Sequence, residues 1–94
     1  MELRIKDIAW GIDRRNGERK ESEVADMTFD LVKEGPLPPV GPSRHVFIVE
    51  KIDEDRISIR LSSKKEPVTI KRKERYEYRP TSFDGGHRYI LEVR

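Results

Sequence analysis

The sequence predicts an all-β fold, an antiparallel β-sandwich of six or seven short strands in one small domain spanning residues 1–94. First, 16 of its 32 apolar residues are Val or Ile, whereas only five are Leu and two are Ala. The chain also contains no Gln. β-branched side chains favour strands, and the residues that helices prefer are scarce. Second, short alternating segments recur about every ten residues with turn signals between them. A small β-barrel is the alternative architecture.

Composition also excludes several classes of protein. Leu, Ile, Val and Phe number 24 of 94 residues and the net charge is +2, so a disordered chain is not expected. No apolar run approaches 18 residues, so we expect no membrane span. Charged residues occur throughout the first 15 positions, so we expect no secretory signal. The absence of Cys excludes disulfide scaffolds and thiolate metal sites. We therefore expect a cytoplasmic protein.

Residues 2–13 are predicted to form the first strand, with an irregularity near Asp7. The apolar phase set by Leu3 and Ile5 changes there, which indicates a β-bulge or an edge irregularity. Asn16-Gly17 then predicts a two-residue turn, because both residues tolerate positive φ. The apolar residues on the second phase are Ile8, Trp10 and Ile12.

Residues 18–34 fit either a strand or a helix. Apolar and polar residues alternate strictly over 25–31, which favours a strand returning antiparallel from the Asn-Gly turn. In the helical alternative, Gly35 would be the C-cap residue and Pro36 would end the helix.

Residues 35–44 contain four of the six prolines and are predicted to be a loop, in part polyproline II. The loop would cross between sheets or cap one end of the fold. Lys33, Pro36 and Pro39 have the spacing that SH3-type grooves accept, although rigid crossovers produce the same pattern. We regard Pro36, Pro38 and Pro39, together with Trp10, as candidate interface residues. Trp10 would either fill the core or anchor an interface.

The second half of the chain predicts the remaining strands. Residues 46–49 and 57–61 form a hairpin whose polar tip is Asp53-Glu54-Asp55-Arg56. Strands over 67–71 and 75–79 follow, separated by a turn or sharp bend at Arg72-Lys73-Glu74, with one long strand as the alternative. Residues 81–86 are expected to be a loop with a turn at Asp84-Gly85-Gly86, and 87–94 the last strand.

The charge is uneven along the chain. Residues 64–79 hold seven basic and three acidic residues, interleaved with two tyrosines. Such a stretch could bind single-stranded nucleic acid if the tyrosines and cations shared one face. The alternation instead places the tyrosines with Val68 and Ile70, and most of the cations on the opposite side. The candidate binding face consists of Lys71, Lys73, Arg75, Tyr76, Tyr78, Arg79 and Arg88.

No pattern in the sequence predicts catalysis, a metal site or a cofactor. His45 and His87 stand alone at predicted strand starts, and even with Asp84 their spacing matches no ligand motif. Asp53, Glu54 and Asp55 lack the spacing of a calcium loop. The serines have no motif around them, so we expect a protein that is not an enzyme.

The leading functional hypothesis is therefore a small protein–protein interaction domain, of an accessory, inhibitory or immunity type, with an unidentified protein partner. The alternative is a small barrel that binds single-stranded nucleic acid through the basic and aromatic strand face. A third hypothesis is a homodimer that pairs edge strands.

Overall fold

The computed structural model describes residues 1–42, 45–80 and 85–94, and these form two antiparallel sheets of four strands each. This arrangement confirms the predicted sandwich, and it is not a closed barrel. The described residues include no helix that could span a membrane. Sheet A has the order β2-β1-β8-β7 and sheet B the order β3-β4-β5-β6. The strands are β1 (Glu2–Ile12), β2 (Arg19–Asp30), β3 (Gly35–Pro36), β4 (Phe47–Ile52), β5 (Arg56–Leu61), β6 (Val68–Lys71), β7 (Arg75–Tyr78) and β8 (Gly85–Val93).

The core lies between the facing surfaces of the two sheets. Its side chains come from alternate positions of the strands, because successive residues of a strand point to opposite faces. Ile57, Ile59 and Leu61 of β5 and Tyr89, Leu91 and Val93 of β8 belong in this way to one buried cluster. The other buried members are Leu3, Ile5, Leu31, Val40, Phe47, Val49, Ile70 and Tyr78.

Residues 19–30 form a strand, which confirms the strand over the helix. The predicted irregularity near Asp7 is also present, but the extra residue belongs to β2. Asp7 pairs with Ala25 and Ile8 with Glu23, so Val24 bulges out of the ladder, while β1 keeps an unbroken register with β8. The change of apolar phase in β1 therefore marks a change of face, with Ile8, Trp10 and Ile12 on the outer face of the sheet.

Three local predictions differ from the structure. The β1–β2 connection is a longer loop over 13–18, in which Gly17 has φ +73° but Asn16 does not have positive φ, so a two-residue type I′ turn is not formed. Gly35–Pro36 pairs with β4 as a two-residue edge strand, a position where Pro loses no ladder bond. Gly85 and Gly86 begin β8 and do not form a turn. The turn at 72–74 is confirmed, with Lys73 at φ 73°.

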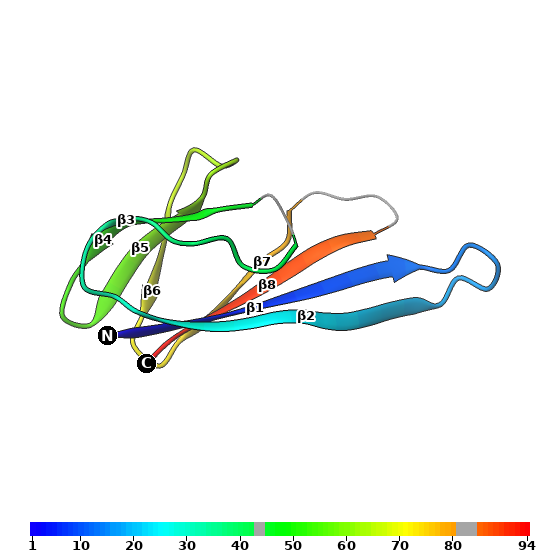
Figure 1. Cartoon of the computed structure of the whole chain (residues 1–94), viewed down its shortest axis with the longest axis horizontal. Coiled ribbons are helices and arrows are strands. Elements are labelled where there is room, and N and C mark those ends of the chain that lie inside the picture. The colour runs from blue at the N-terminus through cyan, green and yellow to red at the C-terminus, as the bar shows by residue number, and fades with distance from the viewer. Residues whose placement is uncertain (43–44, 81–84) are drawn as a thin grey trace.

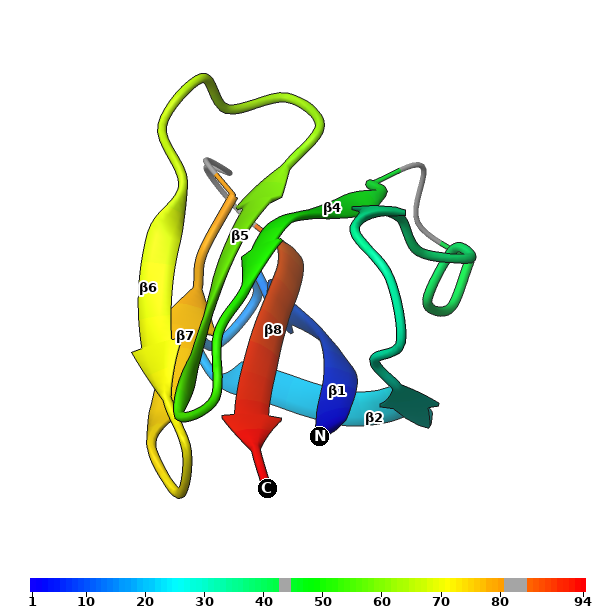
Figure 2. The ribbon, with the colours of Figure 1, turned by 90° about the vertical axis from the view of Figure 1, so that its left-hand side faces the viewer.

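The molecule is elongated, with extents of 49 × 24 × 19 Å, because β1 and β2 run well beyond sheet B (Figure 1). We call this extension the distal arm; it comprises residues 8–12 of β1, 19–23 of β2 and 85–87 of β8. None of the buried apolar cluster lies in these three segments. We call the rest the central sandwich, in which sheet B covers the inner face of sheet A (Figure 2). The Pro-rich loop, residues 35–42 of the described chain, begins at the end of the sandwich opposite the arm, where the chain crosses from β2 to sheet B, and then runs back toward the arm (Figure 1).

Candidate functional site

The outer face of sheet A, which points away from sheet B, carries an apolar patch on the distal arm and at its border with the sandwich. Leu3 and Ile5 point inward, so alternation places Ile8, Trp10 and Ile12 on the outer face. Ile90 of β8 joins them as a diagonal neighbour of Ile8. We call these four residues the Trp10 patch. Ile12 is 41% exposed and the other three are half-buried, and no described element packs over them.

Trp10 is therefore not a core residue, and local contacts determine how its ring lies. It stands opposite Gly86 on β8 and Glu21 on β2, so its direct neighbour on β8 has no side chain, and Arg88 is its diagonal neighbour there. The Arg19 guanidinium lies 4.7 Å from the ring centroid, a cation–π contact. A Cβ on Gly85 would come within 2.8 Å of the Trp10 carbonyl oxygen, which explains a glycine at this position.

Ion pairs cross and border the patch. Arg88 pairs with Glu21 at 3.0 Å and with Glu77 at 3.2 Å, so one guanidinium links β2, β8 and β7. Because β1 lies between β2 and β8, the Arg88–Glu21 pair passes over β1 between Ile8 and Trp10. Arg79 also donates to Glu77 at 2.9 Å. These guanidiniums, Arg79 foremost, hold the pKa of Glu77 below its ordinary value. The outer face thus combines apolar side chains with ion pairs that cross and border them, without an excess of positive charge.

The sequence-predicted binding face is divided among several surfaces. Arg75 and Arg88 lie on the outer face of sheet A, whereas Lys71 ends β6 in sheet B. Lys73 is in the β6–β7 turn. Tyr78 is buried; its ring packs 5.7 Å from Phe47 and its hydroxyl donates to the Ile59 carbonyl at 3.4 Å. Burial raises the pKa of Tyr78. Tyr76 is the more exposed tyrosine, at 37%.

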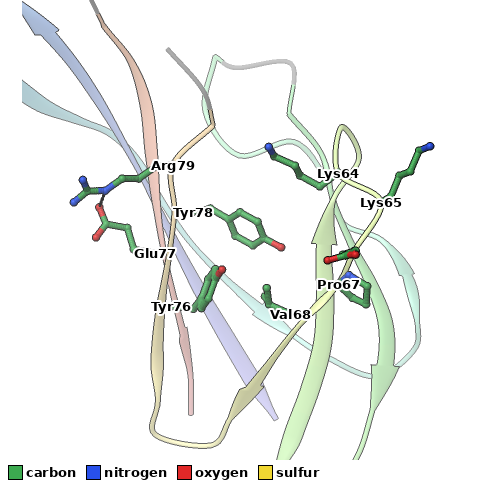
Figure 3. Close-up of a pocket in the computed structure, with 9 residues that line it drawn as sticks. Lys64, Lys65, Pro67, Val68, Tyr76, Glu77, Tyr78 and Arg79 are labelled. Carbon is green, nitrogen blue, oxygen red and sulfur yellow. Dashed lines mark hydrogen bonds and ion pairs between the residues drawn. The ribbon is translucent and has the colours of Figure 1, made fainter. Parts of the chain in front are cut away.

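A groove of 540 Å³ opens at the side of the sandwich, between β6 and β7. The two strands are the edges of different sheets, and they diverge from their shared turn (Figure 2). Tyr76 and Tyr78 point from β7 toward Val68 of β6, and the Lys64 side chain extends over the gap (Figure 3). We call this the lateral groove. It is lined by Lys64, Lys65, Glu66, Pro67, Val68, Tyr76, Glu77, Tyr78 and Arg79.

A buried carboxylate lies on the inner face where the arm meets the sandwich. Asp7 is completely buried, and its Oδ1 is hydrogen-bonded to Nδ1 of His87 at 2.7 Å. Its Oδ2 accepts no hydrogen bond from the residues that the structure describes. His87 is half-buried and stacks on Tyr89, with 6.2 Å between ring centroids, and His45 meets the same ring edge-on at 6.0 Å.

The Pro-rich loop covers the hydrogen-bonded pair of Asp7 and His87, which we call the dyad. Gly41 lies so close that a Cβ there would be 2.5 Å from Asp7 Oδ2, and its φ is +74°. Val40 beside it is buried, whereas Pro36, Pro38 and Pro39 are exposed. Sequence reasoning missed the dyad, although Asp7 shares the phase of Leu3 and Ile5 and could have been recognised as a charge on the buried face.

The acidic hairpin tip pairs with neighbouring cations. Residues 53–55 are exposed, Asp53 pairs with Lys51 and Asp55 with the adjacent Arg56. Asp84 lies outside the described residues, and within them no three acidic or histidine side chains are arranged to hold a metal ion. Asp7 and His87 resemble two members of a catalytic triad, but no described hydroxyl hydrogen-bonds to His87.

Comparison with models of protein families, with curated proteins and with solved structures found no match to this chain.

Proposed function

We propose that this chain is a non-enzymatic, accessory protein-interaction domain that binds a protein partner through the Trp10 patch. The observation that carries the proposal is the position of Trp10, half-buried on an outer sheet face that no described element covers. Binding energy in protein interfaces concentrates in a few residues, among which Trp, Tyr and Arg are enriched, surrounded by a polar rim. The patch and its ion pairs have this composition.

The same face is poorly suited to nucleic acid. Phosphate binding depends on cations that are free to replace the counterions of the backbone. Arg88 is held between Glu21 and Glu77, and Arg79 is held by Glu77 as well. The partner we propose presents an apolar surface bordered by charges of both signs.

Affinity capture with matched variants tests the proposal. Wild-type chain, Trp10→Ala and Val32→Ser are immobilised and exposed to extract; Val32 is the control because it is 81% exposed and lies away from the patch. We expect wild type and Val32→Ser to retain the same protein, and Trp10→Ala to lose it. Retention of that protein by Trp10→Ala would contradict the proposal. Circular dichroism verifies that all three chains are folded.

The occupant could also be a second copy of the chain, and sedimentation distinguishes this case. If the wild type self-associates and Trp10→Ala is a monomer, the partner is the chain itself. If Trp10→Ala self-associates as strongly as the wild type, the patch is not the dimer contact.

A further inference from the structure

We propose that the lateral groove is a second, independent binding site, which takes a short extended peptide carrying an acidic residue next to apolar ones. The peptide would add as a strand to the free edge of β7. This inference does not depend on the Trp10 patch, which lies on the opposite face of sheet A.

The backbone on both sides of the groove is available for pairing. β7 is hydrogen-bonded only to β8, and β6 only to β5, within the described strands. Each therefore leaves one row of N–H and C=O groups unpaired, which is the feature that β-strand addition uses. β7 contains no proline and no bulge, and the charged side chains of this short strand, Arg75 and Glu77, lie on the outer face of sheet A rather than toward the groove.

The shape of the groove is fixed by backbone hydrogen bonds at its closed end. In the β6–β7 turn, Arg72 N donates to the Asp55 carbonyl at 2.6 Å and Lys73 N to the Val93 carbonyl at 2.6 Å. The turn is thus tied to both sheets and holds the two edges apart. A preformed site reduces the ordering cost of binding.

The side chains of the groove define the preferred ligand. Tyr76 and Val68 provide an apolar wall on each side, and the Tyr76 ring contacts Tyr78 edge-on at 5.0 Å. Apolar side chains on one face of an added strand would pack between these walls. Lys64 extends over the opening and makes no ion pair with a described residue, whereas Lys65 points away from the gap (Figure 3). An acidic side chain is the complement of the uncommitted Lys64 ammonium group.

The charge is too small for a nucleic acid strand. Glu77 and Arg79 are paired with each other and point away from the gap (Figure 3). Glu66 offsets one of the two lysines, which leaves a net charge of about +1 along the groove. A strand with a phosphate on every nucleotide needs a longer basic track, whereas one or two carboxylates do not.

Titration of ¹⁵N-labelled chain tests this site with three probes: the peptide Asp-Val-Asp-Phe-Asp-Val-Asp, the same peptide with Lys at every Asp, and twelve-residue oligothymidine. We expect the acidic peptide to shift the amides of residues 64–68 and 75–78 and to bind at least about tenfold more tightly than the basic one. N-methylation of alternate residues in the acidic peptide should abolish binding, because it removes the ladder hydrogen bonds.

Two variants and a control complete the experiment. Lys64→Glu and Tyr76→Ser should each weaken the acidic peptide several-fold, whereas Lys33→Glu, an exposed charge outside the groove, should leave binding unchanged. The inference is overturned if the acidic peptide shifts no groove amides at millimolar concentration, or if N-methylation has no effect. Tighter binding of oligothymidine at the same amides would reassign the groove to nucleic acid. Trp10→Ala should bind the peptide normally, so either proposal can fail alone.

Discussion

The central sandwich and the distal arm share the strands β1, β2 and β8, but their apolar side chains point to opposite faces of the sheet. In the sandwich, residues such as Leu3 and Leu91 are fully buried between two sheets. In the arm, β1, β2 and β8 continue without sheet B, and apolar residues such as Trp10 and Ile12 turn to the outer face. The buried cluster thus supplies most of the folding free energy, whereas the apolar residues of the arm stay on the surface, where they can contact a partner. Asp7 and His87 stand at the junction.

The largest difference between the two regions should appear on truncation of Ile side chains. Ile59→Ala removes a fully buried side chain from the sandwich and should lower the free energy of unfolding by about 2–5 kcal/mol. Ile12→Ala in the arm should change it by less than about 0.5 kcal/mol, because Ile12 is exposed. Urea denaturation measures both. Equal losses of unfolding free energy in the two variants would mean that Ile12 is packed as tightly as a core residue.

At the junction, we expect His87→Leu to destabilise the fold by about 1–3 kcal/mol, since it leaves the buried Asp7 side chain without its hydrogen-bond partner. The double variant Asp7→Leu/His87→Leu should recover part of that loss, because a buried pair can often be replaced by apolar residues. A double-mutant cycle in thermal unfolding gives the coupling energy. Additive losses would show that the 2.7 Å contact contributes no pairwise stabilisation.

Substitution of two glycines with nearly the same φ tests whether the Pro-rich loop packs tightly against Asp7. Gly17→Ala and Gly41→Ala both place a Cβ in the left-handed region, which costs about 1–2 kcal/mol. Gly17 has open space around it, whereas at Gly41 the Cβ would press on Asp7 Oδ2 and lie 3.2 Å from Ala25 Cβ. Gly41→Ala should therefore be the more destabilising in denaturant titration. Equal effects would indicate that the loop does not press on Asp7.

The smallest expected effect concerns the ion pairs of Glu77. Because the pKa of Glu77 is lowered in the folded chain, its ion pairs stabilise the fold at neutral pH, and this contribution disappears as the pH falls below about 4.5. Glu77→Gln should cost about 0.2–1 kcal/mol at pH 7 and nothing at pH 2. Glu34→Gln, an exposed carboxylate away from these ion pairs, is the control. A loss of equal size at both pH values would contradict the assignment.

The strands were predictable from the sequence because alternation and turn residues are local signals. The strand over 25–31 and the turn at Lys73 are examples. The partners of each strand are not local information, so sequence could not place Asp7 next to His87, 80 residues away. Nor could it distinguish a bulge in β1 from the actual bulge at Val24 in β2, since only the cross-strand register reveals it. For the same reason the lateral groove, formed by edges of two sheets, was not foreseen.

Amide hydrogen exchange on the isolated chain tests most directly the division between a stable sandwich and an arm free to bind. We expect the amides of Ile57, Ile59 and Leu91 to exchange only through global unfolding, so that their opening free energy equals that from denaturation. The amides of Trp10 and Glu21 should exchange faster, through local opening of the arm. Equal protection in both regions would contradict the account, because the arm would then be part of a single cooperative core.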